Sequence, residues 1–243
     1  MDHLEAFIYH IRMKRLIIAN WKMNGSKQLI QEFRSLKEVA GTIAVICPPS
    51  CYLSLFSDTT MKFGAQNCHH ANSGAFTGEI SATQLKELGC AYVILGHSER
   101  RTHFNETDSQ VNHKAAKAIE HGLVPIICIG ETYAERHENR FEHVLLSQMD
   151  RSTHGLPRHR YVIAYEPIWS IGTGLVPTQH DIQNVIALIK HRLGNDTSVI
   201  YGGSVNDKNA ADLSNIPGLN GVLVGGASLN VATFQSIIDA FET

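Results

Sequence analysis

Short runs of apolar residues recur along the chain, separated by longer segments in which polar and apolar residues mix. There are eight such runs, and most are rich in valine and isoleucine with few polar positions. Nearly continuous apolar runs are typical of strands that are buried on both faces, as in a parallel sheet. The runs begin at Arg15, Thr42, Lys62, Ala91, Val124, Tyr161, Ser198 and Gly221, and the run at Lys62 is the weakest strand prediction.

Most of the segments between the runs have the period of a helix. Their apolar residues recur three and four positions apart, which places them in one stripe on a helix face. The clearest stripes are Leu29–Phe33–Leu36–Ala40, Ile182–Val185–Ile186–Ile189 and Val231–Phe234–Ile238–Phe241. Helix starts are marked by the capping-box pairs Ser81 with Gln84, Thr132 with Glu135 and Thr178 with Asp181.

Strand and helix therefore alternate, which predicts βα units joined by right-handed crossovers. Eight units fit a single (β/α)8 TIM barrel, with eight parallel strands ringed by helices. A doubly wound open sheet is the alternative. If it bound a dinucleotide, its first βα turn would carry Gly-x-Gly-x-x-Gly, whereas this turn reads NWKMNG. We predict one barrel domain over residues 15–243. Residues 1–14 are expected to be an N-terminal extension, either a mobile tail or the product of an upstream start codon.

The amino-acid composition of the chain limits the kinds of molecule that it is expected to bind. The chain has 243 residues, 43% of them hydrophobic, and a formal net charge of -2 at pH 7. This near-neutral balance predicts binding neither to nucleic acid nor to an anionic membrane, and no apolar run approaches the length of a membrane span. The five cysteines are odd in number and form no Cys-x-x-Cys pair, which indicates free thiols in a reducing cytoplasm.

Polar residues and glycines follow the apolar runs, where the carboxyl ends of barrel strands would carry a site. Two glycine pairs come after the seventh and eighth runs, at Gly202–Gly203 and Gly225–Gly226. Glycine lets backbone N–H groups approach a ligand closely, and barrels often bind phosphate with these two loops. One pair alone would be read as a tight turn, but two pairs in the expected loops favour phosphate.

Three charged or titratable residues follow other runs. Glu166 ends the sixth run, and Pro167 biases it toward extended backbone, so its carboxylate can face a substrate. A helix expected to begin near Ser98 would favour the neutral form of His97, which can donate a hydrogen bond to a carbonyl. Lys22 can offset the charge of a phosphate or an oxyanion. Taken alone, Glu166 is better read as a solvated or salt-bridged residue. The position of His97 does not settle its role, and Lys22 without its neighbours reads as a surface lysine.

The segment after Glu166, which reads PIWSIGTGLVP, is longer than usual for a βα connection. A loop of this kind can close over a site as a lid, although it can also be an ordinary connection. The histidines offer no set with the spacing of metal ligands, no His-Glu-x-x-His occurs and no P-loop is present. We therefore predict neither a metal nor a cofactor.

Seven blocks in chain order resemble the triosephosphate isomerase family. They are ANWKMNG (19–25), GAFTGEIS (74–81), VILGHSERR (93–101), CIGET (128–132), AYEPIWSIGTG (164–174), YGGSV (201–205) and GVLVGGASL (221–229). The resemblance implies a cofactor-free enzyme that interconverts D-glyceraldehyde 3-phosphate and dihydroxyacetone phosphate through an enediol(ate), in glycolysis and gluconeogenesis. Glu166 matches the general base and His97 the neutral electrophile. Asn20 and Lys22 match the residues that support the developing charge and the phosphate.

The resemblance also implies the secondary roles. Phosphate contacts match Gly172, Ser204, Gly225 and Gly226. The lid matches Pro167, Ile168, Trp169, Ser170, Ile171, Gly172, Thr173 and Gly174, with Tyr201 and Ser204 as its latch. Ser98 matches a partner of the base, and Glu99 a partner of Lys22.

Two further points follow from the resemblance. At the end of the lid the chain departs from the family pattern with Leu175-Val176-Pro177, and proline stiffens the backbone there. The loop around Thr77 resembles the one by which each subunit of a homodimer reaches its neighbour's active site, although it can also pack on its own barrel. Two rival functions stay open: another phosphate-binding barrel enzyme, and a non-catalytic barrel used for binding.

Overall fold

The computed structural model describes residues 14–171 and 175–242. Eight parallel strands follow one another around a closed barrel, and the last pairs with the first. They are β1 Arg15–Asn20, β2 Thr42–Cys47, β3 Lys62–Ala65, β4 Tyr92–Leu95, β5 Val124–Ile129, β6 Val162–Tyr165, β7 Ser198–Tyr201 and β8 Gly221–Val224. The predicted (β/α)8 fold is confirmed, including the weak strand at Lys62, and the open-sheet alternative is wrong.

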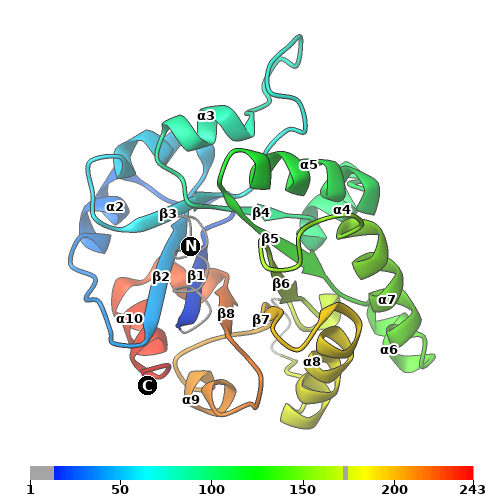
Figure 1. Ribbon diagram of the computed structural model, residues 1–243. Coiled ribbons are helices and arrows are strands. Elements are labelled where there is room, and N and C mark those ends of the chain that lie inside the picture. Colours follow the sequence, from blue (N-terminus) through cyan, green and yellow to red (C-terminus); the bar gives the residue numbers. More distant parts are fainter. Residues whose placement is uncertain (1–13, 172–174, 243) are drawn as a thin grey trace.

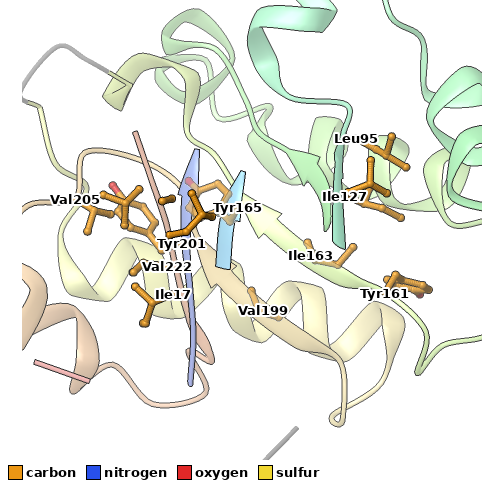
Figure 2. Close-up of a cluster of buried hydrophobic side chains, with 14 of the residues drawn as sticks. Ile17, Leu95, Ile127, Tyr161, Ile163, Tyr165, Val199, Tyr201, Val205 and Val222 are labelled. Carbon is orange, nitrogen blue, oxygen red and sulfur yellow. The ribbon is translucent and has the colours of Figure 1, made fainter. Parts of the chain in front are cut away.

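Successive residues of each strand face different layers of core. In β1, Leu16 and Ile18 belong to the hydrophobic cluster inside the barrel, whereas Ile17 and Ala19 belong to the larger cluster between barrel and helices. Figure 2 shows part of the larger cluster, in which Ile17 lies beside Val222. Because both faces are apolar, the strands read as continuous apolar runs rather than alternating ones.

Helices form a ring around the strands (Figure 1). The ring contains α2 Lys27–Phe33, α3 Ala82–Glu87, α4 Ser98–Phe104, α5 Asp108–Glu120, α6 Tyr133–His137, α7 Phe141–Ser152, α8 Gln179–Leu193, α9 Ala210–Ser214 and α10 Val231–Asp239. Three shorter 3-10 helices lie in loops, η1 Ser50–Phe56, η2 Ile168–Ser170 and η3 Gly226–Leu229. All three predicted capping boxes form. A fourth, which pairs Thr107 with Gln110 at the start of α5, was not predicted.

One predicted helix is too long. The stripe from Leu29 to Ala40 predicted a helix of that length, but α2 ends at Phe33. Beyond it, the backbone N–H of Lys37 donates to Gln235 Oε1 at 2.8 Å, and Gln235 belongs to α10. A contact with a distant helix therefore takes up a backbone group that a longer α2 would have used.

The connection between β3 and α3 projects away from the barrel (Figure 1). Its base is closed where the backbone N–H of His69 donates to Ile80 O at 2.8 Å. Near the tip, the Phe76 ring packs on the His69 ring at 4.1 Å between centroids, yet the Phe76 side chain stays 45% exposed. Thr77, which follows it, is also exposed.

Two expectations concern the N-terminal extension and the absence of a membrane-spanning segment. Residues 1–13 of the expected N-terminal extension lie outside the described residues, so that expectation stays a prediction. In the part of the chain that the structure describes, no helix has both the length and the apolar character needed to cross a bilayer.

Candidate active site

A cavity of about 260 Å³ opens at the carboxyl ends of the strands. It brings together residues that follow five different strands and lie up to two hundred positions apart in the chain. Of the predicted site residues, it is lined by Asn20, Lys22, His97, Glu166, Ile171, Ser204, Gly225 and Gly226. Three predicted residues, Gly172, Thr173 and Gly174, lie outside the described residues. Residues 167–170, Ser98, Glu99 and Tyr201 do not line this cavity, and Thr77 lies in the projecting connection between β3 and α3.

Glu166 is held at the end of β6 by its backbone N–H, which donates to Ile129 O at 2.7 Å. Its side chain is 1% exposed. One carboxylate oxygen, Oε2, accepts a hydrogen bond from the backbone N–H of Ser98 at 3.3 Å. The other, Oε1, has no hydrogen-bond partner among the described residues. A buried carboxylate oxygen without a partner is unusual, and it leaves Glu166 able to accept a proton from a molecule in the cavity.

His97 faces this carboxylate, with 3.4 Å between His97 Nε2 and Glu166 Oε1. It is the N-cap of α4, and its Nδ1 accepts a hydrogen bond from the backbone N–H of Glu99 at 3.2 Å. An Nδ1 that accepts cannot carry a proton, so the proton of the neutral ring lies on Nε2. The local fold therefore directs an N–H donor into the cavity.

Lys22 extends into the cavity from a residue with φ +52°, and its Nζ donates to Glu99 Oε1 at 2.6 Å. This is the contact that the resemblance implied. Partial burial alone would raise the pKa of Glu99, but the hydrogen bond from Lys22 and the charge of Lys22 outweigh it and lower that pKa. The Asn20 side chain accepts from the Lys22 backbone N–H at 3.1 Å, which links the two residues of this turn.

The two glycine pairs differ in how closely other atoms pack around them. A Cβ on Gly202 would lie 2.8 Å from Glu166 Cγ, and one on Gly203 would lie 2.1 Å from the Tyr201 hydroxyl oxygen. A Cβ on Gly226, in contrast, would meet nothing within 4 Å. The first pair therefore makes room for Glu166 and Tyr201, whereas Gly226 borders open space. All four glycines line the cavity, and phosphate binding by the two pairs stays a prediction.

The start of the predicted lid is anchored to the barrel. Trp169 Nε1 and the Tyr165 hydroxyl each donate to Glu131 Oε1 at 3.0 Å. Glu131 is fully buried, and burial raises its pKa even though these donors and Arg136 oppose the shift. The residues on either side of 172–174 reach the cavity, because both Ile171 and Val176 line it.

Sequence reasoning missed several lining residues, among them Val176, Asn206 and Leu223. Leu223 had a readable signal, because it lies in an apolar strand and belongs to the cluster inside the barrel, two residues before Gly225. Val176 and Asn206 lie in loops, and their place depends on the path of the chain rather than on a periodic pattern.

A second cavity of about 580 Å³ adjoins the first and shares Asn20, Lys22 and His97 with it. Two exposed apolar side chains border it, Met23 at 96% and Phe104 at 65% exposure. In the described ranges, no group of three or more His, Cys, Asp or Glu side chains is arranged to hold a metal ion.

The chain has a closed barrel, and a carboxylate, an imidazole and an ammonium group gather at the carboxyl ends of its strands. This combination is typical of (β/α)8-barrel enzymes. The family model of triosephosphate isomerase matches residues 15–241. The chain therefore belongs to the triosephosphate isomerase family.

Similar proteins support this assignment along nearly the whole chain. The triosephosphate isomerase of Wolbachia sp. subsp. Brugia malayi (strain TRS) is 47% identical over 237 residues, which cover 95% of this chain and 99% of that protein. That of Wolbachia pipientis wMel is 45% identical, with 95% of each chain covered. That of Hahella chejuensis (strain KCTC 2396) is 40% identical, with 93% of this chain and 98% of that protein covered.

Proposed function

We propose that this chain interconverts D-glyceraldehyde 3-phosphate and dihydroxyacetone phosphate, with Glu166 as general base and His97 as electrophile. One observation carries the proposal. Glu166 Oε1, a buried oxygen without a hydrogen-bond partner among the described residues, lies 3.4 Å from His97 Nε2 at the cavity. As a member of its family, the enzyme would act in glycolysis and gluconeogenesis. The cytoplasm suits its cysteines, all five of which are free thiols.

The chemistry is the transfer of one proton between adjacent carbons. Glu166 removes the proton from the carbon next to the carbonyl, and the electron pair left behind forms a carbon–carbon double bond while negative charge moves to the carbonyl oxygen. The N–H of His97 stabilises that charge, because donors aimed at a developing oxyanion lower the barrier. The hydroxyl proton on the first carbon then passes to the oxyanion. A new carbonyl forms on that first carbon while Glu166, now protonated, returns its proton to the former carbonyl carbon. Lys22 and Asn20, on the same wall, support the oxyanion and the phosphate.

The phosphate of the substrate would occupy the side of the cavity bordered by Gly225 and Gly226. Support comes from the open space beside Gly226 and from Lys22, whose Cε lies 3.6 Å from the position of a Cβ on Gly225. Backbone N–H groups at the start of η3 favour an anion there. Ser204 is a further contact in the proposal, as is Gly172, which lies outside the described residues. Residues 167–174 serve as the lid that excludes water during the reaction.

The decisive experiment is a coupled assay from glyceraldehyde 3-phosphate, with no nucleotide or metal added. We expect activity that EDTA does not reduce. Glu166→Gln should lower kcat by at least about 10²-fold, the lower end for loss of a general base. Glu87→Gln, at an exposed residue of α3, serves as the matched control and should behave as the wild type. A Glu166→Gln enzyme that changes only in KM would contradict the role of Glu166.

The active form in this proposal is a homodimer. The cavity of about 580 Å³ shares three residues with the active-site cavity, and the projecting loop carries an aromatic side chain that is 45% exposed. The occupant we assign to the cavity is this loop, with Thr77 near its tip, from a second copy of the chain. The cavity is also lined by Gly78 and Glu79 of this chain's own loop, so a two-fold axis can exchange the two loops symmetrically.

A further inference from the structure

A further cavity of about 580 Å³ lies at the amino ends of the first strands, at the opposite end of the barrel from the active site. Lys14, Thr42, Lys62 and Tyr92 line it, and they lie at or directly before the first residues of β1, β2, β3 and β4. Cavities that hold small molecules commonly measure about 300–1,000 Å³. This one shares no lining residue with the active-site cavity, so a molecule bound here would not occupy the active site.

The cavity lies where β2 extends beyond the start of β3. β2 pairs with β1 from Thr42 onward, whereas its pairing with β3 begins only at Val45 and Lys62. Thr42, Ile43 and Ala44 therefore have no strand on one side, and all three line the cavity. The open edge of β2 leaves space beside the sheet that a third strand would otherwise fill.

Much of the cavity wall is apolar. Its larger apolar contributors are Leu36, Val39, Ala40, Ile43, Ile46 and Met61. Leu36 and Ala40 belong to the stripe that continued past the end of α2 at Phe33. Residues that had predicted further helical turns thus form a wall of this cavity, and such a wall suits the hydrocarbon part of a ligand.

Tyr92 contributes a hydroxyl group without a partner. Its side chain is 1% exposed and belongs to the hydrophobic cluster inside the barrel, yet it also lines the cavity. The hydroxyl makes no hydrogen bond with any residue in the described ranges, although a buried tyrosine hydroxyl usually has a partner. Burial raises the pKa of Tyr92, so the hydroxyl stays protonated and can donate to an oxygen atom of a bound molecule.

The charge of the lining is positive. Three lysines, Lys14, Lys37 and Lys62, line the cavity with a single carboxylate, Glu38. Among the residues that the structure describes, none of these three lysines forms an ion pair, and the lysine ion pairs lie elsewhere. Lys37 and Lys62 are exposed to solvent, so their ammonium groups are free to meet an anion at the mouth of the cavity.

We propose that this cavity binds an apolar carboxylic acid that carries a second oxygen atom at the far end of its hydrocarbon body. The carboxylate lies among the lysine ammonium groups, the hydrocarbon contacts the apolar wall, and the Tyr92 hydroxyl donates to the second oxygen. Complementary charge selects an anion over a cation of the same shape, and the unpartnered hydroxyl selects an acid with the second oxygen over one without it.

The first test measures binding to the wild type by titration calorimetry at neutral pH, with ω-hydroxyoctanoate, octanoate and octylamine as probes. The three have hydrocarbon chains of the same length and differ in end groups. We expect saturable one-to-one binding of ω-hydroxyoctanoate, weaker binding of octanoate and no binding of protonated octylamine in the same range. If octylamine bound as well as octanoate, or if ω-hydroxyoctanoate did not bind saturably, the inference would be wrong.

The second test separates the two ends of the ligand. Tyr92→Phe keeps the ring and removes the hydroxyl, so it should weaken ω-hydroxyoctanoate about fivefold, as for one lost hydrogen bond, and leave octanoate unchanged. Lys37→Gln combined with Lys62→Gln should weaken both acids about fivefold, as for two exposed ion pairs. Lys27→Gln changes an exposed lysine of α2 that does not line the cavity, and it should bind both acids as the wild type does.

Unchanged affinity for ω-hydroxyoctanoate in either Tyr92→Phe or the double lysine variant would overturn the inference. The lysine variant changes only exposed residues, so it decides the question even if Tyr92→Phe does not fold.

Enzyme kinetics show at which end of the barrel the acid binds. Saturating ω-hydroxyoctanoate should leave KM for the triose phosphate unchanged, because the two cavities share no residue. Competitive inhibition would place the acid in the active site and would contradict the inference. A wild type without isomerase activity would instead contradict the proposed function, and the binding measurements would still decide this inference.

Discussion

At the scale of single residues, the two glycine pairs offer a direct comparison, because one is packed and the other faces open space. Gly226→Ala adds a methyl group where no atom lies within 4 Å, in the region we assign to the phosphate. We expect the free energy of unfolding to change by less than about 0.5 kcal/mol, as for an unpacked surface site, and KM for the triose phosphate to rise. Urea denaturation and steady-state kinetics measure the two effects.

Gly203→Ala is the matched variant, since its methyl group would collide with the Tyr201 hydroxyl. Here the free energy of unfolding should fall by about 1–3 kcal/mol, the range for an overpacked interior. If Gly226→Ala left KM unchanged, the phosphate would have to bind elsewhere in the cavity.

The same residues show how far sequence reasoning reached into the site. Apolar runs locate the ends of strands, so residues that directly follow them, such as Asn20, His97 and Glu166, could be expected at one rim. The meeting of Ser170 and Tyr201 beside Gly203 was implied only by the family resemblance, because Ser170 lies in η2 and Tyr201 at the end of β7. Periodicity describes neighbours along the chain, whereas this contact depends on how distant segments pack.

At the scale of elements, all eight strands and the starts of α3, α4, α6 and α8 could be predicted, whereas helix ends could not. A start has its own signal, a side chain that caps free N–H groups. The stripe of Leu36 and Ala40 continued past the end of α2 at Phe33. In that segment the backbone N–H of Lys37 donates to Gln235, nearly two hundred residues away, a tertiary contact that the stripe does not reveal.

The capping box that was not predicted gives the prediction at this scale. The Thr107 hydroxyl accepts from the backbone N–H of Gln110 at 3.3 Å, at the start of α5. Thr107→Ala should lower the free energy of unfolding by about 1 kcal/mol, as for other N-cap threonines, with kcat unchanged. Thr107→Ser keeps the hydroxyl and should stay close to wild type in the same urea titration. Equal losses in both variants would mean that the methyl group, and not the cap, stabilises the helix.

At the scale of the whole molecule, alternation of strand and helix was compatible with an open sheet as well as a barrel. Closure depends on the pairing of β8 with β1, between Leu16 and Gly221 and the residues that follow each. No periodicity in either strand specifies that partner. Two observations favoured the closed fold, the count of eight βα units and the family resemblance. Both concern the whole chain rather than the pattern within one segment.

The proposed homodimer is the last prediction and belongs to this scale. Thr77→Arg places a long cation at the tip of the projecting loop, so that the loop can no longer enter the cavity beside Lys22 and His97 of a second copy. The loop projects from the ring of helices (Figure 1), so we expect its own barrel to fold as in the wild type. We expect the wild type to sediment as a dimer and Thr77→Arg as a monomer with lower kcat/KM.

Ala211→Arg introduces the same charge at an exposed position of α9, across the barrel from that loop, and should remain an active dimer. The loss of activity in Thr77→Arg should follow the monomer fraction as protein concentration is varied, because the cavity shares Asn20, Lys22 and His97 with the active site. A wild type that is monomeric and fully active at the assay concentration would show that each barrel completes its own site, and that the loop serves another purpose.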